Sequence, residues 1–133
     1  MSRPIGTDAV LHIGEIAERV GLSLRTVRYY EEQGLIKPAG RTEGGFRLYT
    51  DEQADRLLLI KQMKPLGFTV QQMRELLQAR DRLDHPDIDT RTAAAGRIAE
   101  FAQDAAAGVV KLQQQLTLAE AFAQQLADAT ATS

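Results

Sequence analysis

A length of 133 residues suits one small domain with a helical extension, and 44% hydrophobic with 26% charged residues is typical of a soluble folded protein. The absence of cysteine excludes disulfides, thiolate metal sites, iron–sulfur clusters and a cysteine nucleophile. The net charge of −2 is unevenly distributed along the chain. Residues 1–80 carry 12 Lys and Arg against 10 Asp and Glu, while residues 81–133 carry 4 Lys and Arg against 8 Asp and Glu. This distribution fits an N-terminal part that contacts phosphate and a C-terminal part that is held away from it.

No run of about 18 apolar residues occurs, and the first residues lack the apolar core of a signal peptide. We therefore expect a cytoplasmic protein without a membrane partner.

Two short helices joined by a tight turn form the first predicted unit. Apolar residues recur at helical spacing at Ile13, Ile16, Ala17 and Val20. Gly21 breaks this helix, Ser23 is a natural N-cap for the next one, and Gly34 is suited to end that second helix with a positive φ. Two helices connected in this way are typical of a helix-turn-helix motif.

The second helix is expected to present a DNA-reading face. With Leu24, Val27 and Tyr30 turned inward, the outward residues are Arg25, Thr26, Arg28 and Tyr29. Arginine can read a guanine edge with two hydrogen bonds, and Tyr and Thr can contact phosphate or a thymine methyl group. The alternative is that the two arginines only solvate the helix, with Arg28 paired to Glu32 one turn later.

A β-hairpin is predicted directly after the helix-turn-helix, where it would form a wing. Gly44 and Gly45 supply its turn between two short extended runs. Strand alternation puts Phe46 and Leu48 on one face, and Arg47 and Tyr49 on the other.

Two further helices are predicted, each opened by a capping box. Thr50 with Gln53 opens the third helix, and Thr69 with Gln72 opens the fourth. Pro65 and Gly67 are expected to end the third helix. Residues 81–89 are rich in aspartate and follow no calcium-loop spacing, so we expect a solvated linker in which Asp89 or Thr90 caps the next helix.

A long helix is predicted over residues 90–128, with a frayed tail over 129–133. Its apolar residues step by four and three in an unbroken a/d register: Ile98, Ala102, Ala105, Val109, Leu112, Leu116, Ala119, Ala123 and Leu126. This seam, as we call these nine residues, favours a self-associating coiled coil. The alternative is packing on the chain's own domain, since Phe101, Val110, Leu118 and Phe122 widen the stripe.

The residues from Ile13 to Ile36, with Val27-Arg28-Tyr29-Tyr30-Glu31 before Gly34-Leu35-Ile36, resemble the MerR family of bacterial transcriptional regulators. The wing Gly45–Tyr49 and the corner Leu66–Thr69 follow in the family's order and spacing. The resemblance implies a mainly α fold, in which a winged helix-turn-helix DNA-binding domain over residues 11–80 precedes an antiparallel coiled-coil dimerisation helix.

The resemblance also implies a function and a set of contacts. A homodimer would bind a pseudo-palindromic operator in double-stranded DNA and distort a promoter whose −35 and −10 elements are too far apart, so that RNA polymerase engages both. Backbone contacts carry over to the residues at the matching positions, which are Arg41, Arg47, Tyr49, Lys61 and Lys64.

The chain departs from the family at Pro65 and in having no cysteine to supply the thiolate ligands of the family's metal sensors. We also expect no C-terminal drug-binding domain. We therefore expect no metal and no cofactor, and leave the inducer open. No catalytic arrangement of residues is found, so an enzyme is not expected. The competing hypotheses are an architectural or excisionase-like DNA-binding protein, a simple steric repressor, and an interaction module that has lost DNA binding.

Overall fold

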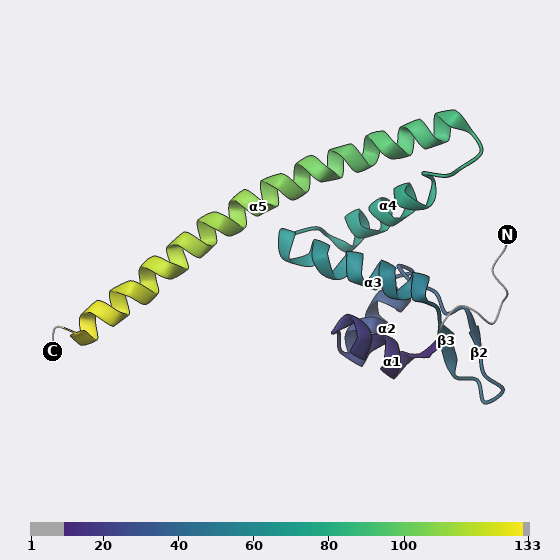
Figure 1. Cartoon of the computed structure of the whole chain (residues 1–133), viewed down its shortest axis with the longest axis horizontal. Coiled ribbons are helices and arrows are strands. Elements are labelled where there is room, and N and C mark those ends of the chain that lie inside the picture. The colour runs from purple at the N-terminus through teal and green to yellow at the C-terminus, as the bar shows by residue number, and fades with distance from the viewer. Residues whose placement is uncertain (1–9, 132–133) are drawn as a thin grey trace.

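The computed structural model describes residues 10–131. In chain order its elements are β1 (Leu11–His12), α1 (Ile13–Val20), α2 (Leu24–Glu32), β2 (Gly40–Arg41), β3 (Arg47–Tyr49), α3 (Asp51–Met63), the 3-10 turn η2 (Lys64–Leu66), α4 (Val70–Asp81) and α5 (Ile88–Ala131). The three strands form an antiparallel sheet in the order β1-β3-β2. The predicted mainly α fold, with a winged helix-turn-helix and a long C-terminal helix, is confirmed (Figure 1).

The helix-turn-helix forms for the reasons that the sequence suggests. Gly21 adopts a φ of 70° at the end of α1, and the Ser23 hydroxyl accepts a hydrogen bond of 3.1 Å from the backbone N–H of Thr26. Gly34 follows α2 with a φ of 77°. These glycines allow the chain to leave each helix in a left-handed conformation that other residues rarely adopt.

Leu24 is an exception to the predicted inner face of α2. It is 42% exposed, whereas Val27 and Tyr30 are buried. Residues three apart on a helix differ by about 60° in direction, so Leu24 and Tyr30 point about 120° apart. A face centred between Val27 and Tyr30 therefore leaves Leu24 at the edge of the core.

One hydrophobic core unites α1, α2, α3, the sheet and α4. Its fully buried large side chains include Ile16, Val20, Val27, Leu35, Ile36, Tyr49, Leu57, Ile60 and Leu77. The capping box at Thr69 is confirmed, since Thr69 and Gln72 exchange hydrogen bonds of 3.1 and 2.9 Å. The capping box predicted at Thr50 is wrong. The Thr50 side chain makes no capping hydrogen bond, and the Gln53 amide oxygen instead accepts a hydrogen bond of 3.0 Å from the Lys37 N–H.

The corner between α3 and α4 forms where Pro65 and Gly67 predicted it. The helix ends at Met63, η2 holds Pro65, and Gly67 has a φ of 89°. Helix α4 then leads through residues 82–87 into α5, which runs back along it (Figure 1).

Helix α5 begins earlier than the sequence indicated. Its first residue is Ile88, because Asp87, rather than Asp89 or Thr90, accepts hydrogen bonds from both the N–H and the hydroxyl of Thr90. These bonds lower the pKa of the Asp87 carboxyl. The helix continues through Ala131, so the start of the tail predicted to fray is helical, and the last two residues lie outside the described part.

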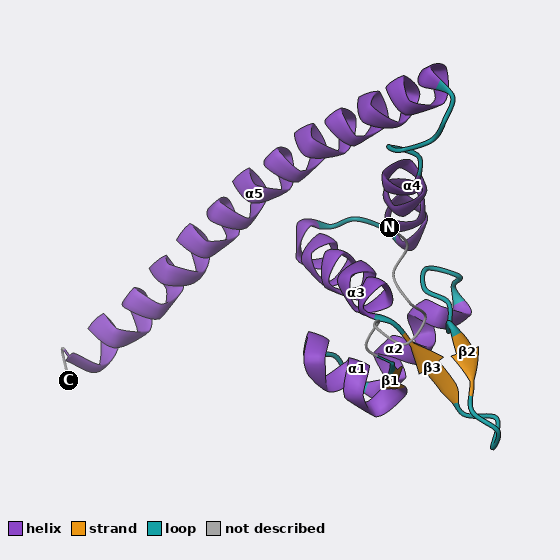
Figure 2. Ribbon diagram, turned by 45° about the vertical axis from the view of Figure 1, so that its right-hand side comes forward, coloured by secondary structure: helices purple, strands orange, loops and turns teal. Residues whose placement is uncertain are grey.

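The first half of α5 packs on its own domain, and the rest projects away from it (Figures 1 and 2). Phe101 is buried with its ring edge against Phe68, at 5.8 Å between centroids. The Arg97 guanidinium lies 4.1 Å from the centre of the Phe101 ring and forms an ion pair of 2.6 Å with Glu75 of α4. Within residues 10–131, none of the helices has the length and apolar character needed to span a membrane.

Candidate DNA-binding surface

The outer face of α2 carries the residues that the sequence assigned to DNA reading. Arg25 and Arg28 are exposed, and Tyr29 is 44% exposed. Thr26 is half-buried and accepts a hydrogen bond of 2.9 Å from the Ser23 hydroxyl, so it also serves the helix start. The structure thus gives α2 a protruding basic and aromatic face of the kind that enters a major groove.

A basic hollow lies between this helix and the wing. It has a volume of about 220 Å³ and is lined by His12, Ile13, Arg28, Arg41, Gly45, Phe46 and Arg47. Three arginines from α2, β2 and β3 thus meet at one concave surface, although they are separated in the sequence. Such a concentration of guanidinium groups suits the phosphates of a nucleic acid backbone.

Glu31, near the end of α2, connects the helix to the wing. Its carboxylate pairs with Arg47 Nε at 3.0 Å and accepts a hydrogen bond from the Tyr49 hydroxyl, while its side chain is only 12% exposed. A guanidinium has five N–H donors, so the pair through Nε leaves Arg47 with further donors for a phosphate. This arrangement fixes the wing arginine relative to α2.

Tyr49 is not on the outer surface, which corrects the DNA contact that the family resemblance implied for it. Its ring is fully buried in the core, and its hydroxyl donates to Glu31. The side of β3 that carries Tyr49 packs on the helix-turn-helix, and this burial, with the neighbouring Glu31 carboxylate, raises the pKa of the Tyr49 hydroxyl. Tyr49 therefore positions Glu31 and Arg47 and has no exposed surface to offer a phosphate.

Phe46 is 69% exposed, whereas Leu48, which strand alternation put on the same face, is half-buried. It precedes β3 and lies beside the turn of the wing, beyond the part of the hairpin that packs on the core. Phe46 and His12 are thus members of the basic hollow that sequence reasoning did not select. The close succession of Gly45, Phe46 and Arg47 at the turn was the available signal for Phe46.

The remaining basic residues differ in their surroundings. Lys61 donates a hydrogen bond of 2.9 Å from Nζ to the carbonyl of Val20, so it stabilises the end of α1. Arg41 donates from Nη1 to the carbonyl of Gly45 at 3.0 Å and thereby braces the wing turn. Lys64 lies exposed at the corner after α3.

The nine seam residues fall into two groups. Ile98, Ala102 and Ala105 border a cavity beside the chain's own α3 and α4. The later ones are on the projecting part of α5, where Leu116 is 58% and Leu126 is 53% exposed. Phe101 packs on the chain's own domain, whereas the apolar stripe from Val109 onward is exposed in the single chain. The self-associating coiled coil stays a prediction.

Comparison with known proteins identifies the family. A family model described as "MerR HTH family regulatory protein" matches residues 11–80, and one described as "MerR, DNA binding" matches residues 54–129. The chain belongs to the MerR family.

Its relatives include the HTH-type transcriptional regulator ZntR of Escherichia coli K12, which is 40% identical over 101 residues, or 76% of this chain and 70% of ZntR. A MerR-family regulator from Listeria monocytogenes has a similar structure, with a TM-score of 0.64 and 28% identity over 80% of this chain and 78% of that one.

HiNmlR, a family member that lacks the sensor domain and was solved bound to promoter DNA, shares the fold, with a TM-score of 0.63 and 24% identity over 88% of this chain and 92% of that one. MerR-family proteins are DNA-binding transcription regulators, not enzymes, and this chain is one of them.

Proposed function

We propose that this MerR-family regulator acts as a homodimer that binds a pseudo-palindromic operator and activates a promoter with an over-long spacer by bending and untwisting it. The observation that carries the proposal is the coupling of Arg47 to α2 through Glu31. It holds a base-reading helix and a backbone-binding wing in one rigid unit. A unit of this kind can transmit force to DNA.

Within this unit we assign base reading to Arg25 and Arg28, with Tyr29 and Thr26 beside them. Arg41, Arg47 and Lys64 are the backbone contacts, since each of these residues is exposed. Lys61 is exposed as well, but its hydrogen bond to Val20 makes a backbone contact secondary to its structural role. Phosphate contacts position the protein, and base contacts supply its specificity.

The dimer in this proposal is an antiparallel coiled coil of two α5 helices joined along the seam. The projecting half of α5 is the support for it, because Leu112, Leu116 and Leu126 are 37–58% exposed in the single chain. Four of the nine seam residues are alanine, which lets the two helices approach closely.

A fixed dimer presents its two α2 helices at a fixed spacing. Adjacent major grooves of straight B-DNA lie about 34–36 Å apart, so a dimer with closer reading helices binds only bent or untwisted DNA. Smooth bending of this kind costs on the order of 1–6 kcal/mol, and the wing arginines of both protomers can offset that cost. RNA polymerase then engages both promoter elements.

Transcription in vitro tests the proposal against a steric repressor. The native promoter should require the protein, whereas a template with two base pairs deleted between its elements should fire without it and be inhibited by it. Arg28→Ala is the matched control, which should lose both effects. Equal repression of both templates would leave DNA binding in place and refute activation by distortion, in favour of the steric repressor.

A further inference from the structure

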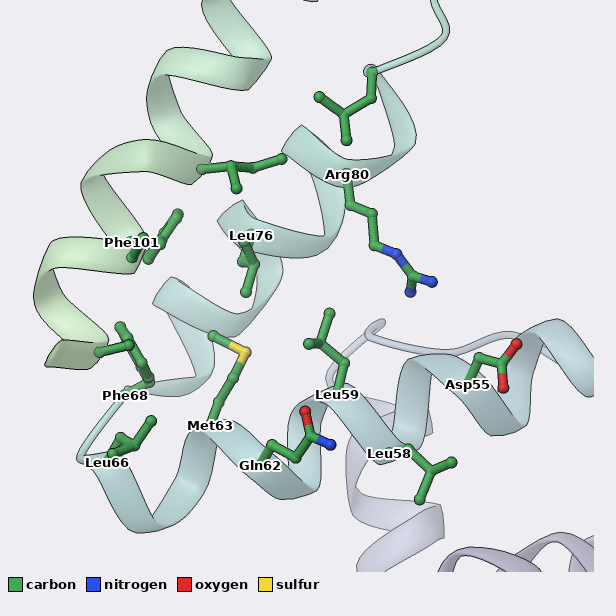
Figure 3. A pocket seen from close by; sticks show the side chains of 14 residues that line it. Asp55, Leu58, Leu59, Gln62, Met63, Leu66, Phe68, Leu76, Arg80 and Phe101 are labelled. Carbon is green, nitrogen blue, oxygen red and sulfur yellow. The ribbon is translucent and has the colours of Figure 1, made fainter. Parts of the chain in front are cut away.

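A cavity of about 570 Å³ opens between α3, α4 and the first half of α5 (Figure 3). Its wall is mainly apolar and includes Leu59, Met63, Phe68, Leu76, Ile98 and Phe101. Charged residues occur at its rim, where Arg80 projects from α4 and Asp55 lies at the end away from α5 (Figure 3). An exposed apolar hollow of this size marks a surface that something else covers.

The seam of α5 runs directly out of this cavity. Ile98, Ala102 and Ala105 belong both to the seam and to the cavity wall. From Val109 onward the same a/d register continues on the projecting part of the helix without interruption. A helix that packs along the whole seam must therefore also cross the mouth of the cavity.

We propose that the second copy of this chain closes the cavity and that the partner's Phe122 fills it. The inference rests on the antiparallel homodimer of the proposed function. If two copies use the whole seam in opposite directions, their two-fold axis passes near its middle residue, Leu112. In such a pair, a residue that follows the axis lies opposite a partner residue that precedes it by about the same number of positions. Phe122 follows Leu112 by ten residues and Phe101 precedes it by eleven, so the partner's Phe122 lies beside Phe101.

The heptad positions also direct that ring into the cavity. Phe101 and Phe122 each precede an a-position alanine, so both are g positions, and in an antiparallel pair the g flanks of the two helices face each other. The chain itself shows where this flank points. Phe101 is buried against its own domain, and a Cβ at Gly108, one heptad later, would lie 2.9 Å from the Leu66 carbonyl.

Two further observations support the partner helix as the occupant. In the single chain Phe122 is 60% exposed, which is unfavourable for a large aromatic side chain unless a partner buries it. Residues 112–131 carry Glu120 and Asp128 but no Lys or Arg, whereas Arg80 stands at the rim of the cavity. Each DNA-binding domain would then be completed by the other protomer, so that a shift of α5 in one protomer acts on α3 and α4 of the other.

Photo-crosslinking tests the contact directly. Phe122→p-benzoylphenylalanine should cross-link, on illumination of the full-length protein, to Leu59, Met63 or Leu76 of the partner subunit. Leu118→p-benzoylphenylalanine is the matched control, because Leu118 is 72% exposed and stands at a c position, away from the seam. A protein that sediments as a dimer but cross-links from position 122 only to residues of α5 after Ala105, or not at all, overturns the proposal while leaving the dimer intact. A protein that sediments as a monomer overturns the dimer as well.

A second measurement asks what else occupies the cavity. Phe122→Ala should raise the dissociation constant of the dimer about tenfold or more and increase the fluorescence of 1-anilinonaphthalene-8-sulfonate, whereas Leu118→Ala should change neither. The opposite result is that the dye already fluoresces brightly with the unsubstituted dimer and that Phe122→Ala does not change this fluorescence. The cavity would then be open to small apolar ligands in the dimer. That result would overturn the proposal.

Discussion

Removing the Tyr49 hydroxyl should destabilise the DNA-binding domain. In Tyr49→Phe the ring stays in the core, but the Glu31 carboxylate, whose side chain is only 12% exposed, loses a hydrogen-bond donor. A hydrogen bond to a charged group contributes about 1.5–3 kcal/mol. In a domain of 60–100 residues each kcal/mol lowers Tm by about 4–8 °C, so the midpoint should fall by at least about 6 °C at pH 7.

The pH dependence provides an independent check on the same residue. The pKa of Tyr49 is raised in the folded protein by burial and by Glu31, so between pH 10 and the folded-state pKa the folded chain retains a proton that the unfolded chain releases. The stabilisation is therefore complete below pH 10 and is lost as the pH rises above it. Tyr30, whose pKa is also raised by burial, contributes in the same direction, so Tyr49→Phe should reduce the alkaline loss without abolishing it.

Thermal unfolding followed by circular dichroism between pH 7 and pH 11 measures both effects. Tyr29→Phe is the matched control, because Tyr29 is 44% exposed on the outer face of α2. That variant should unfold at the temperature of the unsubstituted protein. If Tyr49→Phe leaves both Tm and the alkaline slope unchanged, the buried hydroxyl does not stabilise Glu31 and the reasoning fails.

Three further predictions concern DNA, assembly and metal. Arg28→Ala should reduce the free energy of operator binding by about 1–3 kcal/mol and relax the preference at particular base pairs. Arg47→Ala should weaken binding to all DNA sequences alike and reduce the slope of log K against log salt by about one. If Arg47→Ala leaves affinity and slope unchanged, the wing does not contact the DNA backbone. Replacing Leu112 and Leu116 with Asp should give a monomer in sedimentation with little operator affinity, and a double variant that stays dimeric at micromolar concentration would contradict the seam. Stoichiometric zinc or copper should leave operator affinity unchanged, since the chain has no cysteine and no group of three or more potential ligands gathers within residues 10–131; tight metal binding in calorimetry would refute this.

The sequence by itself determined the elements whose signals are local. Gly21, Ser23 and Gly34 define the helix-turn-helix because a left-handed φ and a side-chain N-cap depend on a few consecutive residues. The corner at Pro65 and Gly67 follows for the same reason. Family membership was also available at this level, because the segment around Val27–Glu31 carries a specific pattern.

Only the tertiary structure decided which sides of these elements are covered. Alternation correctly puts Arg47 and Tyr49 on the same side of β3, but it does not tell that this side packs on the helix-turn-helix, which buries Tyr49 and turns it toward Glu31. Likewise the heptad register runs without a break from Ile98 to Leu126, and only the return of the chain along α4 shows that the first half of α5 lies against its own domain. Periodicity records that a face is apolar, whereas the partner of that face is set by residues far away in the sequence.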